Sequence, residues 1–321
     1  MIWGLIQMVK ILLILLLSIN LFALENVSPT SKFKATGSVQ SMVYDEGKLY
    51  VGTDNGTVEV FDIKSNEKLQ TIKLPNIKDF IGDEIAAKVY SIDKIANKIL
   101  IVSQGMKGYR NLFIYENNQL EKVIGIDQKM FIQKASFISS DLVLFGLLSN
   151  QIGLYDIKNK KQIYLIQISS SSFAHFMVSE DKKRFAHTDE SGRVRIIDVS
   201  NGQVIREPKA LNLDKVFQLD YKNNLILTAG QDRKAVLYDR TSSYSLDFDF
   251  LLYACALSPN AKRGAVAYNE QNEVLIFDIK TQKYLYNLSA QEATLTQILF
   301  VNENELFLSS DSQVINYYKL H

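Results

Sequence analysis

Cysteine, tryptophan and histidine are scarce in this chain of 321 residues, which holds 1, 1 and 3 of them. Because Cys255 is the single cysteine, no disulfide can form within the chain, and the fold must rely on its apolar core. Cys255 lies in the apolar run LLYACALS, which favours a buried, inert thiol over a reactive one.

An excess of positive charge is also missing, since 36 basic residues stand against 35 acidic ones. Proteins that bind nucleic acids or anionic membranes usually carry a basic patch or stripe. We therefore expect no nucleic-acid partner. Hydrophobic residues make up 47% of the chain, which is enough for a large core.

Sequence motifs for catalysis and cofactor binding are absent as well. The chain has no phosphate-binding loop, no nucleophile-elbow motif, no paired-histidine zinc motif and no haem-attachment motif. Neither His175 nor His187 has a Cys or second His at ligand spacing, so we interpret both as packed or surface imidazoles. His321 is the terminal residue. We expect no catalytic residues, no cofactor and no metal, and hence a protein that is not an enzyme.

The first 23 residues resemble a secretory signal peptide. Lys10 precedes the apolar run Ile11–Leu17, and Ala23 is a small residue suited to cleavage. The run is short for a transmembrane helix. We expect export to the periplasm, with no membrane span after cleavage. The alternative is an uncleaved N-terminal anchor, because Leu21 is a poor residue two places before Ala23.

The segment Leu49–Ile63, LYVGTDNGTVEVFDI, is repeated along the chain. It consists of two apolar stretches around the turn Asp54-Asn55-Gly56, which is a strong hairpin signal. Similar phrases recur at residues 225–240 and 264–279.

Each repeat ends its third strand with an aromatic or apolar residue followed by an acidic one. Five of the six steps between successive marks are 39 to 42 residues long, a period typical of propeller blades. We interpret the acids as acceptors for N–H groups of the following turn. The marks are Phe61-Asp62, Tyr115-Glu116, Tyr155-Asp156, Ile197-Asp198, Tyr238-Asp239, Phe277-Asp278 and the degenerate Tyr318-Lys319.

The period predicts an all-β, seven-bladed propeller of four-stranded antiparallel blades over residues 24–321. Blade seven has only three strands before the chain ends, so we expect Lys32–Gly37 to close the ring as its outer strand. The strands expected for blade one are Val39–Tyr44, Leu49–Thr53, Thr57–Ile63 and Leu69–Leu74. Later first strands are expected at Phe173–Val178, Val216–Tyr221, Leu252–Leu257 and Leu295–Val301.

Two loops are longer than the repeat requires, Pro75–Ala87 and Gln104–Asn111. In a propeller both kinds of connection emerge on the same face, and loops on a rigid scaffold often carry binding sites. We therefore predict a protein-binding surface there. Its candidate residues are Phe80, Ile81, Lys107, Tyr109 and Arg110. The alternatives are ordinary variation in loop length, or an apolar pair, Phe80 and Ile81, that packs back onto blade two.

The repeats resemble those of WD40-like and YVTN-type propellers. The resemblance covers residues 32–321 and rests on the period and on the aromatic-acidic mark. The chain lacks the Gly-His and Trp-Asp pairs of true WD40 repeats, which puts the WD40 hydrogen-bond tetrad in doubt.

The whole sequence also resembles accessory protein L of periplasmic nitrate reductase gene clusters. The matching features are the leader ending SINLFALEN, the seven blades, and phrases such as KLYVGTDNGTVEVFDI and LILTAGQDRKAVLYD. The resemblance implies a role in the assembly or activity of the nitrate reductase, without carrying molybdenum or haem itself. We expect a monomer whose protein partner is a subunit of periplasmic nitrate reductase.

Three alternatives remain open: an outer-membrane or envelope assembly scaffold, a propeller enzyme such as a lactonase, and a small-ligand or metal sensor that uses the central channel. The last is disfavoured because the channel-lining strands are expected to be mostly apolar and small, with no cluster of acids or histidines.

Overall fold

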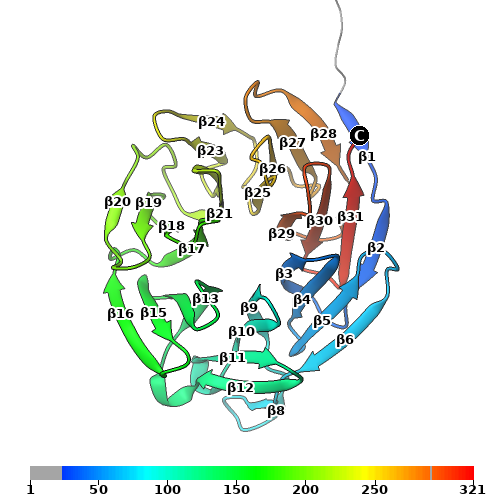
Figure 1. The fold of residues 1–321 in the computed structure, drawn as a ribbon. Coiled ribbons are helices and arrows are strands. Elements are labelled where there is room, and N and C mark those ends of the chain that lie inside the picture. The colour runs from blue at the N-terminus through cyan, green and yellow to red at the C-terminus, as the bar shows by residue number, and fades with distance from the viewer. Residues whose placement is uncertain (1–23, 290) are drawn as a thin grey trace, which may run out of the picture.

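Seven antiparallel blades of four strands surround a central axis, so the chain is an all-β propeller (Figure 1). The computed structural model describes residues 24–289 and 291–321. The expected leader, residues 1–23, lies outside the described residues. The seven blades confirm the architecture predicted from the repeat period.

Within blades one to six the strands follow one another from the axis outward. Blade one consists of β3 (Val39–Asp45), β4 (Lys48–Thr53), β5 (Thr57–Asp62) and β6 (Lys68–Lys73). Blade two consists of β9 (Val89–Ile95), β10 (Lys98–Gln104), β11 (Arg110–Glu116) and β12 (Gln119–Ile124). Blade three consists of β13 (Ile132–Phe137), β14 (Leu142–Leu147), β15 (Gln151–Asp156) and β16 (Lys161–Gln167).

The next three blades repeat this order. Blade four consists of β17 (Phe173–Val178), β18 (Arg184–Asp189), β19 (Val194–Asp198) and β20 (Val204–Arg206). Blade five consists of β21 (Val216–Lys222), β22 (Leu225–Gly230), β23 (Lys234–Tyr238) and β24 (Ser243–Asp247). Blade six consists of β25 (Cys255–Leu257), β26 (Arg263–Ala267), β27 (Val274–Asp278) and β28 (Tyr284–Leu288).

Most predicted strands agree with the structure to within one or two residues. An exception is the first strand of blade six, expected at Leu252–Leu257 and observed only as β25. At its expected start, Leu252 donates its N–H to the carbonyl of Gly230 in blade five.

The middle strands of a blade are buried on both faces because a neighbouring blade covers each face. In β4 and β5 nearly every residue is buried, whereas the outer strand β6 is mostly exposed. The turn between β4 and β5 uses Gly56 at φ 79°, a backbone conformation that favours glycine. A Cβ on Gly56 would also approach the Ala87 nitrogen to 3.1 Å, so side chains larger than hydrogen are disfavoured there.

The aspartates among the acidic marks accept N–H groups of the following turns, as predicted, whereas Glu116 faces Lys98 at 3.9 Å. Asp62 accepts from the N–H groups of Lys64 and Ser65 at 3.0 and 2.7 Å. Asp198 and Asp278 do the same in blades four and six. Hydrogen bonds from these turns hold the pKa of all three carboxyl groups below the ordinary value. The acids therefore stabilise turns.

Blade seven combines both ends of the described chain. Its strands β29 (Leu295–Phe300), β30 (Glu305–Ser310) and β31 (Val314–Lys319) are completed by β2 (Ser31–Lys34), which pairs antiparallel with β31. This confirms the predicted closure, although β2 starts and ends earlier than Lys32–Gly37. Its pairing ends early because Thr36 turns away to donate its N–H to Glu59 of blade one.

Phe33 of β2 joins the first and last blades. Its side chain is 2% exposed, and its ring packs edge-on against Phe61 of blade one and Phe307 of blade seven. The closing strand is therefore anchored by an apolar side chain as well as by hydrogen bonds.

A further N-terminal strand, β1 (Glu25–Val27), pairs in parallel with the outer strand β28 of blade six. The sequence reading did not foresee this fifth strand. Figure 1 shows β1 and β2 following one another along the outside of blades six and seven.

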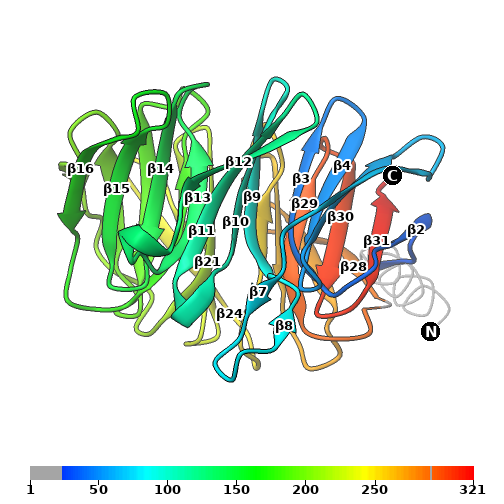
Figure 2. The same ribbon diagram turned by 90° about the horizontal axis from the view of Figure 1, so that it is seen from below.

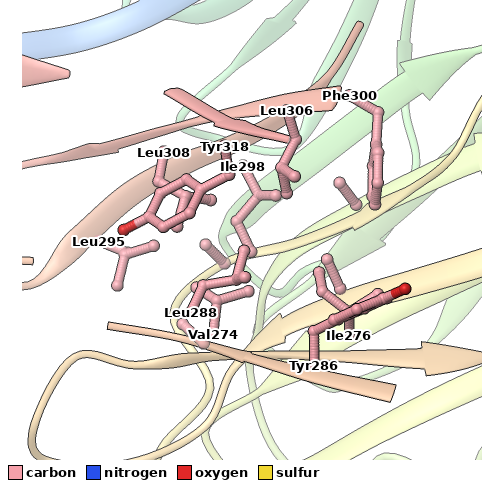
Figure 3. Close-up of a cluster of buried hydrophobic side chains, with 14 of the residues drawn as sticks. Val274, Ile276, Tyr286, Leu288, Leu295, Ile298, Phe300, Leu306, Leu308 and Tyr318 are labelled. Atoms are coloured by element: carbon pink, nitrogen blue, oxygen red, sulfur yellow. The ribbon is translucent and has the colours of Figure 1, made fainter. Parts of the chain in front are cut away.

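Adjacent blades pack through continuous apolar layers. Figure 3 shows the layer between blades six and seven, where aliphatic and tyrosine side chains of β27 and β28 meet those of blade seven. The labelled residues are Val274, Ile276, Tyr286, Leu288, Leu295, Ile298, Phe300, Leu306, Leu308 and Tyr318.

Buried polar networks connect the turns of individual blades. In blade five, the Asn212 side chain accepts from Thr228 at 2.8 Å, contacts the Tyr238 hydroxyl at 3.2 Å and donates to Asp232 at 3.3 Å. This four-residue network is built without the Trp and His of WD40 repeats.

Blade four holds a second buried network around Asp189. Ser169 and Arg195 both donate to Asp189 Oδ2 at 2.8 Å. Burial alone would raise the pKa of Asp189, but these bonds and those from Ser191 hold it below the ordinary value. His187 lies beside this network, 2.7 Å from Asn150 Oδ1, and burial lowers its pKa to about 3. His187 is therefore a packed, neutral imidazole.

We predict that Phe33→Ala lowers the free energy of unfolding by about 3–5 kcal/mol, because it leaves a cavity between two blades. Lys34→Ala, on the exposed side of the same strand, should change it by less than about 0.5 kcal/mol. Chemical denaturation measures both. If the loss for Phe33→Ala stayed below about 1 kcal/mol, β2 would not be anchoring the ring.

Candidate functional site

The five predicted binding residues all lie on one face of the ring. The connection after β6 and the turn after β10 emerge on this face because both strands run in the same direction. The N–H of Gln104, at the end of β10, donates to the carbonyl of Lys88, just before β9. We call this side the loop face; it carries the blade-to-blade connections and the turns between second and third strands.

The long connection from blade one to blade two forms a small hairpin that projects from the loop face. Its strands are β7 (Ile77–Lys78) and β8 (Glu84–Ile85), which the sequence reading expected as loop (Figure 2). Asp79 shapes the tip by accepting N–H bonds from Ile81, Gly82 and Asp83 at 2.8 to 2.9 Å.

The tip presents its two large apolar side chains to solvent. Phe80 is 99% exposed and Ile81 is 82% exposed. The alternative that they pack back onto blade two is therefore wrong for this structure. Most large apolar side chains bury part of their surface on folding, so an exposed pair at a shaped tip is typical of a contact site.

The second loop forms the short 3-10 turn η1 (Met106–Gly108), in which Lys107 is exposed. Tyr109 follows the turn and packs its ring 4.8 Å from that of Phe131, in the connection to blade three. Leu148 donates its N–H to the carbonyl of Phe131 at 3.0 Å. The turn thus continues into the next blade as one surface.

Arg110 is less accessible than expected from the sequence. Its guanidinium lies 4.0 Å from the centre of the Tyr90 ring, and burial lowers its pKa. Its Nε is buried without a hydrogen-bond partner. Arg110 therefore supports the turn, and Lys107 is the exposed cation beside it.

Sequence reasoning missed the neighbours that extend this surface. Met106, Phe131 and Leu148 are 39%, 41% and 50% exposed, and all belong to loop-face turns of blades two and three. We define the apolar patch as two groups on the loop face: the hairpin tip with Phe80 and Ile81, and the turns of blades two and three with Met106, Tyr109, Phe131 and Leu148. The sequence signal for these neighbours is an apolar residue that recurs near the ends of the connections. Each such residue is weak evidence by itself, because a single exposed Leu or Phe is common on protein surfaces.

A second candidate site lies on the axis, in a cavity of about 450 Å³ lined by the inner strands of all seven blades. Six inner strands, in all blades except six, have a register shift near their first residue. The residue just after each shift lines the cavity. These residues are Ser41, Ser91, Lys134, His175, Gln218 and Gln297.

Four of these six side chains accept the N–H of the next blade's inner strand. Ser41 accepts from Ile92 and Ser91 from Ala135, both at 3.2 Å. His175 Nδ1 accepts from Leu219 at 3.4 Å, and Gln297 accepts from Met42 at 2.7 Å, across the junction between blades seven and one. Gln218 differs, because it donates to the carbonyl of Thr296.

Lys134 differs from these side chains because an ammonium group can donate hydrogen bonds but cannot accept them. Its Nζ lies 2.7 Å from His175 Nε2 and 5.8 Å from the centre of the Phe176 ring. Burial lowers the pKa of Lys134 to about 8, although Asp93 and Asp220 oppose this shift. Burial and Lys134 together hold the pKa of His175 well below its ordinary value.

The two channel aspartates bind backbone amides. Asp93 accepts from Lys94 and Phe137, and Asp220 accepts from Tyr221 and Leu257, at 2.7 to 2.9 Å. Burial raises the pKa of Asp93. Both carboxylates therefore join adjacent blades while contributing negative potential near Lys134.

This cluster corrects the expectation that the channel is lined by small apolar residues without acids or histidines. Asp93, Lys134, His175 and Asp220 come from four successive inner strands, each about one repeat apart, so only the closed ring brings them together. The axis also carries Cys255, which is 4% exposed and whose pKa burial raises well above the ordinary value, as the buried-thiol interpretation predicted.

In the described part of the chain, no group of three or more His, Cys, Asp or Glu side chains is arranged to hold a metal ion. None of the helices formed by residues 24–289 and 291–321 is long and apolar enough to cross a bilayer.

No protein-family model and no curated protein matches the sequence. Among solved structures, the crystal structure of the Myceliophteria thermophila Cps50 (Swd1) β-propeller domain matches with a TM-score of 0.74 and 13% identity, covering 92% of this chain and 100% of that one. Because 1869 solved chains match, the likeness is shared widely and identifies the fold alone. The chain therefore has the fold of a seven-bladed β-propeller, and that fold alone does not define a function.

We predict that Lys134 makes stability rise with pH between about 8 and 10. The unfolded chain keeps this lysine protonated up to its ordinary pKa, so it binds more protons than the folded chain in that window. Relative to Lys134→Met, the wild-type free energy of unfolding should therefore increase across it, by at most about 3 kcal/mol. Denaturant titrations at several pH values measure the difference, and a difference independent of pH would contradict the lowered pKa.

Proposed function

We propose that this protein is a non-catalytic scaffold that binds a protein partner through the apolar patch on its loop face. The observation that carries this proposal is the hairpin tip, where Phe80 and Ile81 are 99% and 82% exposed on a backbone fixed by three bonds to Asp79. A preformed apolar tip costs little conformational entropy on binding.

The surroundings of the patch indicate the chemistry of the partner. Lys107 and Lys129 are exposed in the blade-two turns that flank Tyr109 and Phe131, whereas Asp83 and Glu84 are exposed beside the hairpin tip. A partner with an apolar cleft, acidic groups facing the blade-two turns and basic groups facing the tip would complement this surface, and these charges would speed encounter. Of the five residues predicted from the sequence, Phe80, Ile81, Lys107 and Tyr109 contribute contact surface in this proposal, and Arg110 holds the turn.

More specifically, we propose that the partner is a subunit of periplasmic nitrate reductase and that the protein assists assembly or activity of that enzyme. It rests on the sequence resemblance and on the leader, residues 1–23. An envelope assembly scaffold would use the same patch, so the identity of the bound partner distinguishes the two functions.

Export of the protein is the first test of the proposed role with periplasmic nitrate reductase. We expect mass spectrometry of the protein from its native cell envelope to show a mature N-terminus at Leu24. Recovery of the intact chain from the cytoplasm would contradict the periplasmic role, while intact chain in the membrane fraction would favour the uncleaved anchor.

The binding surface is tested by the double variant Phe80→Ser/Ile81→Ser. We expect it to weaken association with purified nitrate reductase subunits by at least about tenfold, while the free energy of unfolding changes by less than about 1 kcal/mol. Isothermal titration calorimetry measures the first quantity and chemical denaturation the second.

Leu213→Ser is the matched control, because Leu213 is 78% exposed on the same face but belongs to the connection before blade five. It should leave binding unchanged. Equal binding by the double variant and the wild type would place the contact surface elsewhere. If the wild type binds no reductase subunit but the patch is required for another partner, the scaffold role holds and the nitrate reductase assignment fails.

A further inference from the structure

We propose that Lys134 is a reactive amine which captures small, neutral carbonyl compounds from the central channel as an imine. The site is independent of the loop face and of any protein partner. It is built from Lys134 on β13, His175 on β17 and the cavity on the axis.

The position of Lys134 points to a role other than structural support. At the equivalent place, Ser41, Ser91, His175 and Gln297 each accept an N–H from the following blade. An ammonium cannot do this. Lys134 therefore does not supply, as an ammonium, the hydrogen-bond acceptor that four other blades have at this position.

Hydrogen bonding at His175 favours the neutral amine. Its Nδ1 accepts the N–H of Leu219, so the proton of the neutral imidazole sits on Nε2, which lies 2.7 Å from Lys134 Nζ. A neutral amine accepts that proton, whereas an ammonium would place two donors against each other. The contact thus favours the neutral form of the amine, whose lone pair a nucleophile needs.

The negative charges around the amine favour its protonated form, but they offset the preference for the neutral form only in part. The charged groups facing it are Asp93 on β9 and Asp220 on β21, and Lys222 also lines the cavity. The oxygens of both aspartates accept backbone N–H groups, and among the described ion pairs neither aspartate lies within 4.0 Å of the Lys134 ammonium position. Burial therefore dominates, and the pKa falls to about 8.

The same charges select the ligand. Asp93 and Asp220 are balanced by Lys134 and Lys222, so the cavity offers no net charge to attract an ion, and the described residues offer no cluster suited to a metal cation. Apolar and aromatic side chains, including Phe173 and Phe217, line the rest of the cavity of about 450 Å³. A small uncharged molecule fits this setting, and an aldehyde or ketone is the class that an amine captures covalently.

The reaction requires no oxidant or reductant. The Lys134 nitrogen adds to the carbonyl carbon while the C=O π electrons move to oxygen, giving a carbinolamine after proton transfer. Formation of the C=N bond then expels the oxygen, and both amine hydrogens leave with it as water. The Nε2–H of His175, released from the amine, lies beside the reacting atoms and can hydrogen-bond the departing oxygen.

Reductive trapping of the full-length protein tests this proposal. The protein is incubated with propanal and cyanoborohydride at pH 7, and the labelled lysines are quantified by peptide mass spectrometry. Lys134 should be labelled at least about tenfold faster than Lys160, whose side chain is 63% exposed, because far more of Lys134 is unprotonated at this pH. It should also exceed Lys222, which lines the same cavity.

Two controls keep the result interpretable. In guanidinium the preference for Lys134 should disappear, and in the folded protein its labelling rate should rise with pH and level off above about 8. His175→Gln should reduce the preference if it folds. Labelling of Lys134 no faster than Lys160 in the folded wild type would overturn the proposal. The Phe80→Ser/Ile81→Ser variant should label normally, so failure of this inference is distinguishable from failure of the binding role.

Discussion

The inner strand of each blade has an open edge, and the ring depends on how that edge is satisfied. Backbone N–H groups facing the axis have no further strand to pair with, and leaving them unpaired away from bulk water is costly. The chain supplies a side-chain acceptor from the preceding blade, as in the bond from Met42 N–H to Gln297 across 255 residues of sequence. These bonds fix the rotation of each blade relative to the next, which in turn allows the apolar layers between blades to interlock.

Ring closure follows from the same constraint. Each blade buries its middle strands only because blades stand on both sides of it, so a missing contact between first and last blades would expose two sheet faces at once. The strand β2 prevents this by placing Phe33 between Phe61 and Phe307. The loop face then becomes a rigid platform, and the hairpin tip at Phe80 can remain apolar and exposed without endangering the core.

The sequence predicted what is local and periodic. The aromatic-acidic mark and the spacing of about 41 residues placed β17 at Phe173–Val178 and the closing strand close to its observed position. The parallel strand β1 was missed because three residues carry no recognisable pattern, and their partner β28 is distant in sequence. The burial of Arg110 against Tyr90 was missed for a related reason, since these residues are 20 positions apart on β11 and β9, which β10 separates, and they meet only after the blade forms. The sequence identified Phe80 and Ile81 as exposed, in a segment that it predicted as a loop, but it did not identify Phe131 and Leu148.

In the channel, the repeat brings together reactive side chains that are far apart in the sequence. Taken alone, Lys134 and His175 are two unremarkable residues 41 positions apart, but the repeat gives them the same place in adjacent blades, and closure brings their nitrogens to 2.7 Å. Natural sequences follow local rules except where function requires otherwise. Here the rule is a side-chain acceptor at one position of the inner strand, and the half-buried Lys134 breaks it without gaining an ion pair among the described residues. The ring would be better stabilised by an acceptor at this position than by Lys134. The fold therefore does not account for the lysine on the axis, just as it does not account for the exposed apolar residues on the loop face.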